Sequence, residues 1–220
     1  QYDGIDIDFE TAADHLGPLN TTPGLFKKFC EELSQYIGPK SGTGRLFLID
    51  GNIDALDQGI AELCNYGVSQ AYGCSSATMG YTSLTSRTAS AERVGWKADQ
   101  LIFTENFESY WKSGGRPHTT LSGEQMMSLQ GMADFAVNGT SCGFGAYHME
   151  YEYGHSDMPY KYMRQGIQYA NPAPHGDYSK NLVTLNEAGE YAFEIPVFPS
   201  GMSDGIRFSL TGSLTGVPTA

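Results

Sequence analysis

The sequence predicts an α/β fold built on a parallel β-sheet, and two observations lead to this prediction. Short apolar segments that suit buried strands alternate with amphipathic segments that suit helices over residues 1–172. The connections between these segments have the lengths that parallel strands need. We expect about five strands and five helices, which fits units four to eight of a (β/α)8 barrel. A doubly wound open sheet is the structural alternative.

The first half of the chain contains three of the expected strands, at residues 2–9, 45–51 and 66–72. The second of these is an almost continuous apolar run, which suits a strand covered on both faces. A helix is expected from its cap at Thr22 to Ile37, where Gly38 ends it. Residues 54–65 are expected to form the next helix, because their apolar side chains recur on one side.

The second half continues the alternation up to the Asn-Pro pair at residues 171–172. Strands are expected at residues 100–104 and 141–149, and helices at residues 82–94 and 159–169. Between them, Ser122 and Gln125 have the spacing of a capping box, so we expect a helix to open there and run through Val137.

The pattern changes after Pro174. Residues 190–197 and 206–210 alternate apolar with polar positions and are separated by turn residues, which is typical of antiparallel strands with one buried face. We therefore expect residues 1–174 to form the α/β domain. Residues 175–220 are expected to form a β-rich tail or the start of an accessory β-sandwich domain. A tail without helices that packs on the α/β domain is the alternative.

Charge and composition exclude several classes of protein. The 220 residues carry a formal net charge of −12, which disfavours binding to nucleic acid or to anionic membranes. No apolar run approaches the roughly 20 residues that a membrane span needs. None of the four cysteines forms a CxxC pair, so a zinc site is not expected. Cys64 and Cys74 flank an expected strand and could form a disulfide.

A row of acids occupies the first ten residues. Asp6, Asp8 and Glu10 recur at every second position, so they share one face of the expected strand, and the apolar residues between them face the other way. Like charges in a row, with no Lys or Arg among them, repel one another and raise pKa values. Neighbouring carboxyl groups can then hold different protonation states, which acid–base catalysis requires. The row favours a catalytic site, and a solvated edge strand is the alternative.

The motif Asp3-x-x-Asp6-x-Asp8-x-Glu10 resembles the DxxDxDxE signature of glycoside hydrolase family 18, the chitinases and endo-β-N-acetylglucosaminidases. The resemblance implies that residues 1–174 are the C-terminal part of a (β/α)8 barrel, with the motif on its fourth strand. It implies that Glu10 is the general acid/base and that Asp8 orients the substrate's own 2-acetamido group, which acts as the nucleophile. It also implies that Asp6 supports Asp8.

Polar residues follow the other expected strands, at the ends where a barrel places its site. Gln70 and Tyr72 share one strand face. This Gln-x-Tyr form resembles the bacterial endo-β-N-acetylglucosaminidase branch, whereas chitinases commonly have Met-x-Tyr-Asp there. The resemblance implies that Tyr72 hydrogen-bonds the acetamido group, and a purely structural Gln–Tyr pair is the alternative. The further candidate sugar contacts are Asp50, Asn52, Glu105, Asn106 and Tyr147.

Aromatic residues gather in the same places. Tyr147 falls where chitinases place a large aromatic floor under the scissile sugar, and a tyrosine there again resembles the endo-glycosidase branch. Aromatic residues in the loops suit stacking on pyranose rings or, alternatively, loop packing; they are Tyr81, Tyr110, Trp111, Tyr151 and Tyr153. Glu108 is interpreted as a surface acid, and His148 as a structural hydrogen-bonding residue.

The resemblance implies a retaining, substrate-assisted endo-β-N-acetylglucosaminidase that cleaves between the two core GlcNAc residues of N-glycans without a metal or organic cofactor. A chitinase is the alternative among enzymes. A glycan-binding protein of the same fold is the alternative outside enzymes, although such proteins typically lack the final Glu that Glu10 provides. The expected partner is an N-glycan or another GlcNAc-containing oligosaccharide, with no nucleic acid and no membrane-spanning segment.

The position of the motif suggests that more of the barrel exists. The strand that carries the motif would be fourth in a barrel but is first here. We expect the N-terminal part of the barrel in the full protein or in another chain, and the strand at residues 2–9 as an interior member of the sheet. A signal or anchor sequence would lie upstream, which implies an extracellular, periplasmic or cell-surface protein.

Overall fold

The computed structural model describes residues 2–11, 16–72, 80–155 and 158–171. The chain divides into two compact units, Gln1–Ala173 and Pro174–Ala220. The second unit lies outside the described residues, so its β-rich character stays a prediction. The first unit contains the α/β fold.

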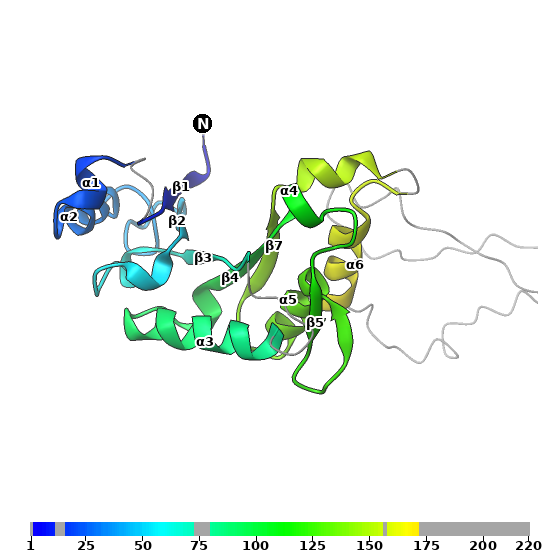
Figure 1. The fold of residues 1–220 in the computed structure, drawn as a ribbon. Coiled ribbons are helices and arrows are strands. Elements are labelled where there is room, and N and C mark those ends of the chain that lie inside the picture. Colours follow the sequence, from blue (N-terminus) through cyan, green and yellow to red (C-terminus); the bar gives the residue numbers. More distant parts are fainter. Residues whose placement is uncertain (1, 12–15, 73–79, 156–157, 172–220) are drawn as a thin grey trace, which may run out of the picture. The chain divides into compact units, whose positions relative to one another are not determined.

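Five strands form one parallel sheet, which confirms the predicted α/β class (Figure 1). Their bounds are β1 (Gly4–Phe9), β2 (Leu46–Gly51), β3 (Tyr66–Gln70), β4 (Leu101–Asn106) and β7 (Gly143–Tyr147). They are ordered β1-β2-β3-β4-β7, and every neighbouring pair is parallel. The order therefore follows the sequence without a reversal, and within the described residues β1 pairs only with β2.

Helices follow the strands and lie on one face of this sheet (Figure 1). The longer ones are α2 (Leu25–Leu33), α3 (Gly80–Arg93), α5 (Ser128–Val137) and α6 (Lys161–Ala170). Two shorter ones are α1 (Pro18–Thr21) and α4 (Phe107–Tyr110), and α4 directly follows β4. In the described residues no helix is both long and apolar enough to cross a bilayer.

The pleat of the strands separates a buried face from an open one. Phe47, Ile49 and Phe103 point toward the helices and are at most 1% exposed, and they form the centre of the hydrophobic core. Asp8 and Tyr147, which point the other way, remain exposed. Because successive side chains of a strand alternate between faces, every second residue of the sheet reaches the open face. The candidate site lies on that face.

The predicted helix at residues 54–65 is wrong. The structure instead has two short 3-10 turns, Ile53–Ala55 and Ala61–Leu63. Gly59 between them has a φ of 91°, which belongs to the left-handed region and interrupts a right-handed helix. The apolar residues that suggested a helix are nevertheless buried, among them Leu56, Ile60 and Leu63.

The predicted capping box at residues 122–125 is also wrong. A hairpin of β5 (Pro117–Thr119) and β6 (Gln125–Met127) occupies this segment, and α5 begins only at Ser128. The Thr120 hydroxyl accepts a hydrogen bond from the Glu124 amide at 3.0 Å and closes the hairpin turn, in which Gly123 has a φ of 86°. The local side-chain bonds therefore stabilise a turn rather than a helix start.

Cys30, Cys64 and Cys142 are free thiols, and the first two are buried. Burial raises the pKa of the Cys30 thiol to about 12. These two side chains thus belong to the core. Cys74, with which Cys64 could form a disulfide, lies outside the described residues.

His118 gives the fold a pH-dependent stability. Its side chain is 2% exposed and packs against Gly80 and Gly131. Burial lowers the pKa of His118, although the charge of Asp134 opposes this effect. Below about pH 6.5 the unfolded chain takes up a proton that the folded chain excludes. The free energy of unfolding therefore decreases as the pH is lowered, by up to about 1.4 kcal/mol per pH unit.

We therefore expect His118→Phe to flatten the dependence of unfolding free energy on pH between about pH 6.5 and 5. The measurement is urea unfolding of both proteins at several pH values. Only the slopes are compared, so a general loss of stability in the variant does not affect the conclusion. Parallel slopes for the two proteins would contradict the expectation.

Candidate active site

The acidic row lies on the open face at the carboxyl end of β1. Asp6 and Asp8 are exposed and share that face, and Glu10 continues the alternation one residue beyond the strand. In the pairing register Asp8 lies beside Asp50 of β2. Paired residues of parallel strands point to the same face, so the structure brings Asp50 to the row, as expected for a candidate site residue.

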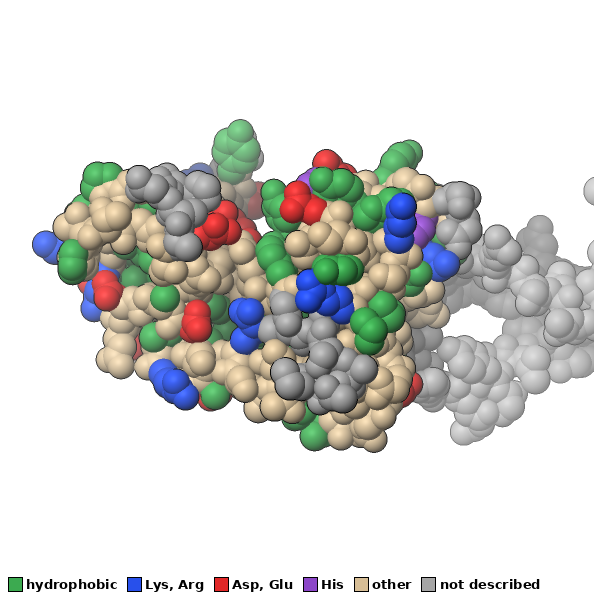
Figure 2. Space-filling model, viewed as in Figure 1, with side chains coloured by type: hydrophobic (Ala, Val, Ile, Leu, Met, Phe, Trp, Pro, Cys, Tyr) green, Lys and Arg blue, Asp and Glu red, His purple; other side chains and the backbone are tan. Residues whose placement is uncertain are grey.

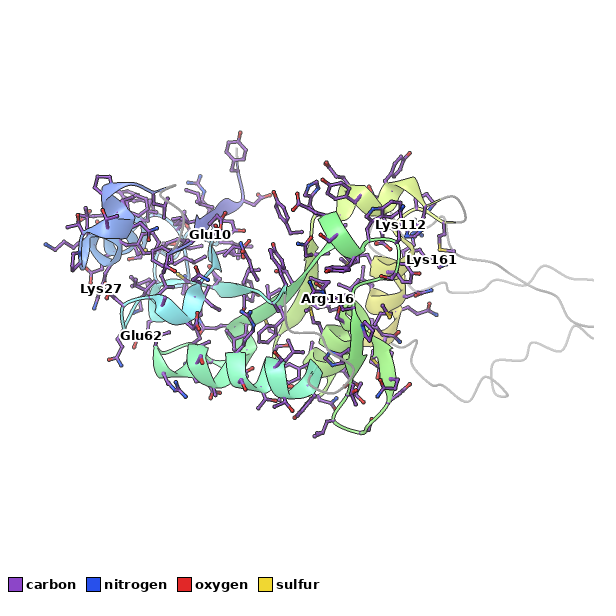
Figure 3. All side chains as sticks on the ribbon, viewed as in Figure 1. Glu10, Lys27, Glu62, Lys112, Arg116 and Lys161 are labelled. Atoms are coloured by element: carbon purple, nitrogen blue, oxygen red, sulfur yellow. The ribbon has the colours of Figure 1, made fainter. Side chains whose placement is uncertain are left out.

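Figure 3 labels Glu10 near the carboxyl end of β1. Three polar contacts hold the backbone around this residue. The Asn20 side-chain amide donates to the Glu10 carbonyl oxygen at 2.6 Å, and the Asn52 amide donates to the Phe9 carbonyl oxygen at 2.8 Å. The Asn52 side-chain oxygen accepts from the Thr11 amide at 2.9 Å. Asn52 was predicted to contact sugar, but this oxygen is used to anchor the segment that positions Glu10.

Strand β3 supplies the amide and phenol that the sequence singled out. The Gln70 side-chain amide donates to the Asp8 carboxylate at 3.2 Å. Tyr72 follows on the same face, and its ring lies 6.4 Å from that of Tyr147 on β7. Gln70, Tyr72 and Tyr147 therefore meet the acidic row on one surface.

Burial and like charges act on these acids. The pKa of Asp50 is raised to about 6, first by burial and then by the charges of Asp6 and Asp8. Burial and the charge of Asp8 also raise the pKa of Asp6. The predicted mutual effect within the acidic row is therefore present at Asp6, and the row acts in the same way on Asp50. Among the described residues, no group of three or more His, Cys, Asp or Glu is arranged to hold a metal ion.

Burial, more than any neighbouring charge, also raises the pKa of Tyr72. Its hydroxyl therefore keeps its proton at ordinary pH and remains a hydrogen-bond donor. The Thr104 hydroxyl of β4 shares its single proton between the Tyr72 oxygen and the Ser69 carbonyl oxygen, which lies 3.3 Å away. These contacts orient a neutral donor beside the acidic row.

Aromatic side chains extend the open face beyond β7. Tyr147 is 49% exposed, and its ring makes an edge-to-face contact with His148, whose ring centroid lies 4.5 Å from that of Tyr151. His148 is thus held between two tyrosines, consistent with a structural role. Figure 2 shows hydrophobic side chains beside acidic ones over α4 and the segment after β7. Such a surface presents flat apolar rings next to carboxyl groups, which suits a carbohydrate.

Glu105 requires a correction. It was predicted to hold sugar, but its side chain points to the helical face and is 0% exposed. It accepts hydrogen bonds from the Ser128 hydroxyl and from the Asn106 amide. The residue shares its face with Leu101 and Phe103, because strand residues two apart point the same way. Glu105 therefore ties β4 to the start of α5.

Asn106 shares the open face with Tyr147, its partner in the register. Its side-chain oxygen, however, accepts from the Ser109 amide at 3.1 Å and caps α4. The side-chain oxygens of Asn106 and Asn52 therefore both accept hydrogen bonds from backbone amides of the protein. Glu108, interpreted from sequence as a surface acid, is exposed on α4.

We expect Glu105→Ala to lower the stability by about 1–3 kcal/mol, because the variant leaves buried hydrogen-bond donors without an acceptor. The Michaelis constant for a glycan substrate should stay close to that of the wild type. Chemical unfolding and steady-state kinetics measure the two quantities. The exposed neighbour Glu108→Ala is the matched control, with a change below about 0.5 kcal/mol. A stable variant with weakened substrate binding would restore Glu105 to the sugar site.

Two residues of the site were missed from the sequence, Asn20 and Thr104. Thr104 had a usable signal, since it lies two residues before Asn106 and so shares its strand face. Asn20 had none, because it reaches Glu10 from the short helix α1 through the tertiary fold.

A cavity of about 560 Å³ lies away from this surface, at the amino-terminal ends of β3 and β4. Lys40, Glu62 and Asn65 are among its lining residues. None of Asp6, Asp8 and Glu10 lines this cavity. In folds of this kind the chemistry is performed at the carboxyl ends of the strands, so we assign the site to the open face.

Carboxyl groups beside an amide and a phenol, at the carboxyl ends of parallel strands, are compatible with acid–base chemistry on a glycosidic bond. A sequence profile described as glycoside hydrolase family 18, BT1044-like, matches residues 1–169. The chain therefore belongs to glycoside hydrolase family 18, which confirms the resemblance that the acidic motif predicted.

Individual relatives are consistent with this assignment. Endo-beta-N-acetylglucosaminidase F2 from Elizabethkingia meningoseptica is 40% identical over 79 residues, which are 35% of this chain and 22% of that protein. The structure of a selenomethionine variant of BT1044 matches with a TM-score of 0.63 and 27% identity, over 77% of this chain and 54% of that chain. The match thus covers about half the length of BT1044 and about a fifth of the first protein.

A more distant structure shares the fold. The endo-beta-N-acetylglucosaminidase from Cordyceps militaris was solved as a mutant in complex with fucosyl-N-acetylglucosamine-Asn. It matches with a TM-score of 0.50 at 19% identity, over 77% of this chain and 57% of that chain. At this identity the likeness shows the fold alone.

Proposed function

We propose that this chain provides the catalytic face of a retaining, substrate-assisted endo-β-N-acetylglucosaminidase that cleaves N-glycans between the two core GlcNAc residues. The observation that carries the proposal is the hydrogen bond from Gln70 to Asp8 on the face shared by the acidic row and Tyr72. A Gln-x-Tyr pair beside the motif favours this activity over chitin hydrolysis. The relative F2 is, by its name, an endo-beta-N-acetylglucosaminidase.

In the proposed mechanism Glu10 protonates the glycosidic oxygen and later takes a proton from water. Asp8 holds the acetamide N–H and offsets the positive charge of the oxazolinium ion that forms. Tyr72 donates to the acetamide oxygen and directs it at the anomeric carbon. No residue of the chain acts as a covalent nucleophile, so the configuration is retained through the substrate's own acetamido group. The chemistry uses no cofactor.

The same proposal includes the architecture around the site. We take the parallel sheet to be strands four to eight of a (β/α)8 barrel. A strand order without reversal and helices on one face support this assignment, because a doubly wound sheet reverses its order and carries helices on both faces. Since N-glycans occur on extracellular glycoproteins, we propose that the protein acts outside the cytoplasm.

The test is to incubate the full-length protein with a high-mannose glycoprotein, a complex-type glycoprotein and chitin oligomers, and to weigh the products. Endo-glycosidase activity leaves one GlcNAc on the glycoprotein and releases the remaining glycan. Cleavage of chitin oligomers alone would establish the chitinase alternative. Binding of a glycan without any product would establish the carbohydrate-binding alternative.

A further inference from the structure

Asp50 occupies a central place on the open face. It lies on β2, between Asp8 of β1 and Val68 of β3 in the pairing register. One of its carboxyl oxygens, Oδ1, is buried and has no hydrogen-bond partner. Gln70 hydrogen-bonds the Asp50 carboxyl group and also donates to Asp8 at 3.2 Å. Asp50 and Asp8 therefore use the same side-chain amide.

The charges around Asp50 all have the same sign. Asp6 and Asp8 face it from β1, and Gln70 and Tyr72 are its neighbours from β3. Within the described residues, the open-face positions of the five strands hold no Lys, Arg or His. A buried carboxylate oxygen without a donor is costly, and nearby negative charge adds to that cost. Protonation lowers both penalties, and the raised pKa of Asp50, about 6, agrees with a neutral acid.

We propose that Asp50 is a positioning residue that acts as a neutral carboxylic acid and thereby leaves the Gln70 amide to Asp8. This inference rests on the proposed function and concerns how Asp8 is held in position to bind the substrate. When Asp50 loses its proton, it attracts the Gln70 amide more strongly and adds a negative charge beside Asp6 and Asp8. The hydrogen bond that orients Asp8 is then weakened, because the ionised Asp50 draws the same amide nitrogen toward itself. The site is therefore ready for substrate below about pH 6 and progressively less so above it.

The sign of the pH dependence follows from the proton balance. The form of the site that binds glycan carries one more proton than the form that does not. Above the pKa of Asp50 the dissociation constant should therefore rise, at most tenfold per pH unit for one proton. This prediction differs from a role as a direct sugar contact, in which a charged Asp50 would bind sugar hydroxyls more tightly.

The experiment uses the full-length protein with Glu10→Gln, so that the glycan is not cleaved and Glu10 does not titrate. Binding of the neutral pentasaccharide Man3GlcNAc2 is measured by calorimetry from about pH 4.5 to 8. We expect the dissociation constant to rise above about pH 6. Adding Asp50→Asn, a neutral isostere, should hold the constant at its low-pH value throughout. Asp54→Asn, an exposed position on the turn after β2, is the matched control and should keep the transition.

Two outcomes would overturn the proposal. One is a folded Asp50→Asn variant that keeps the transition, and the other is a folded variant that binds weakly at every pH. If this variant does not fold, infrared spectra of the Glu10→Gln protein with 13C-labelled aspartate provide the second measurement. They should show an aspartic acid that loses its proton near pH 6, and its absence would also overturn the proposal. An enzyme that releases the expected products without this transition would leave the proposed function standing.

Discussion

Replacing Glu10 with glutamine should lower glycan hydrolysis by about 10²–10⁴-fold in the full-length protein, because general acid–base catalysis contributes a factor of this size. Glutamine keeps the shape of the side chain but cannot give up or accept the proton. The contacts from Asn20 and Asn52 act on the backbone, so they should persist and leave the surroundings of residue 10 in place. Glycan binding should remain close to that of the wild type.

Single-turnover rates and calorimetric binding separate these two effects. Glu108→Gln is the matched control, since Glu108 is an exposed acid on α4 and should tolerate the same change without loss of turnover. Turnover of the Glu10 variant at the wild-type level would remove Glu10 from the mechanism. Equal losses in both variants would point to a general effect of removing charge from a protein of net charge −12.

Removing the hydroxyl of Tyr72 should lower kcat by about 10²–10³-fold, the effect of losing one donor that stabilises a transition state. The pKa of Tyr72 is raised by burial, so this hydroxyl is a donor across the working pH range. In Tyr72→Phe the ring still packs near Tyr147, so the Michaelis constant should change much less than kcat. Affinity for GlcNAc-thiazoline, a mimic of the oxazolinium ion, should fall in parallel with kcat.

Tyr66→Phe is the control, because Tyr66 lies on the same strand at its opposite, amino-terminal end. Its kinetics should match those of the wild type. Two results would exclude substrate assistance: a covalent glycosyl-enzyme trapped on an Asp or Glu, or products of inverted configuration. A Tyr72 variant that loses only binding affinity would exclude the role given to its hydroxyl.

Much of the fold could be predicted because the sequence signals are local. The strands have short apolar runs, and the helices at residues 82–94 and 159–169 have the amphipathic period, so both were found near their observed bounds. The prediction failed where the local backbone conformation or a local hydrogen bond favoured a turn over a helix. The left-handed Gly59 broke the helix expected at residues 54–65, and the Thr120–Glu124 contact turned an expected helix start into a hairpin.

The sequence by itself determined the acidic row and the Gln-x-Tyr pair, because alternation along one strand depends only on the pleat. It could not determine how the faces of different strands match. Glu105 was predicted to contact sugar but lies on the buried face of β4, since the phase of a strand follows from its pairing with its neighbours. Only the tertiary structure placed Asp50 beside Asp8 and allowed the Gln70 side-chain amide to hydrogen-bond both carboxyl groups. Burial and neighbouring charge set the protonation of such groups, and both arise only when separate segments pack together.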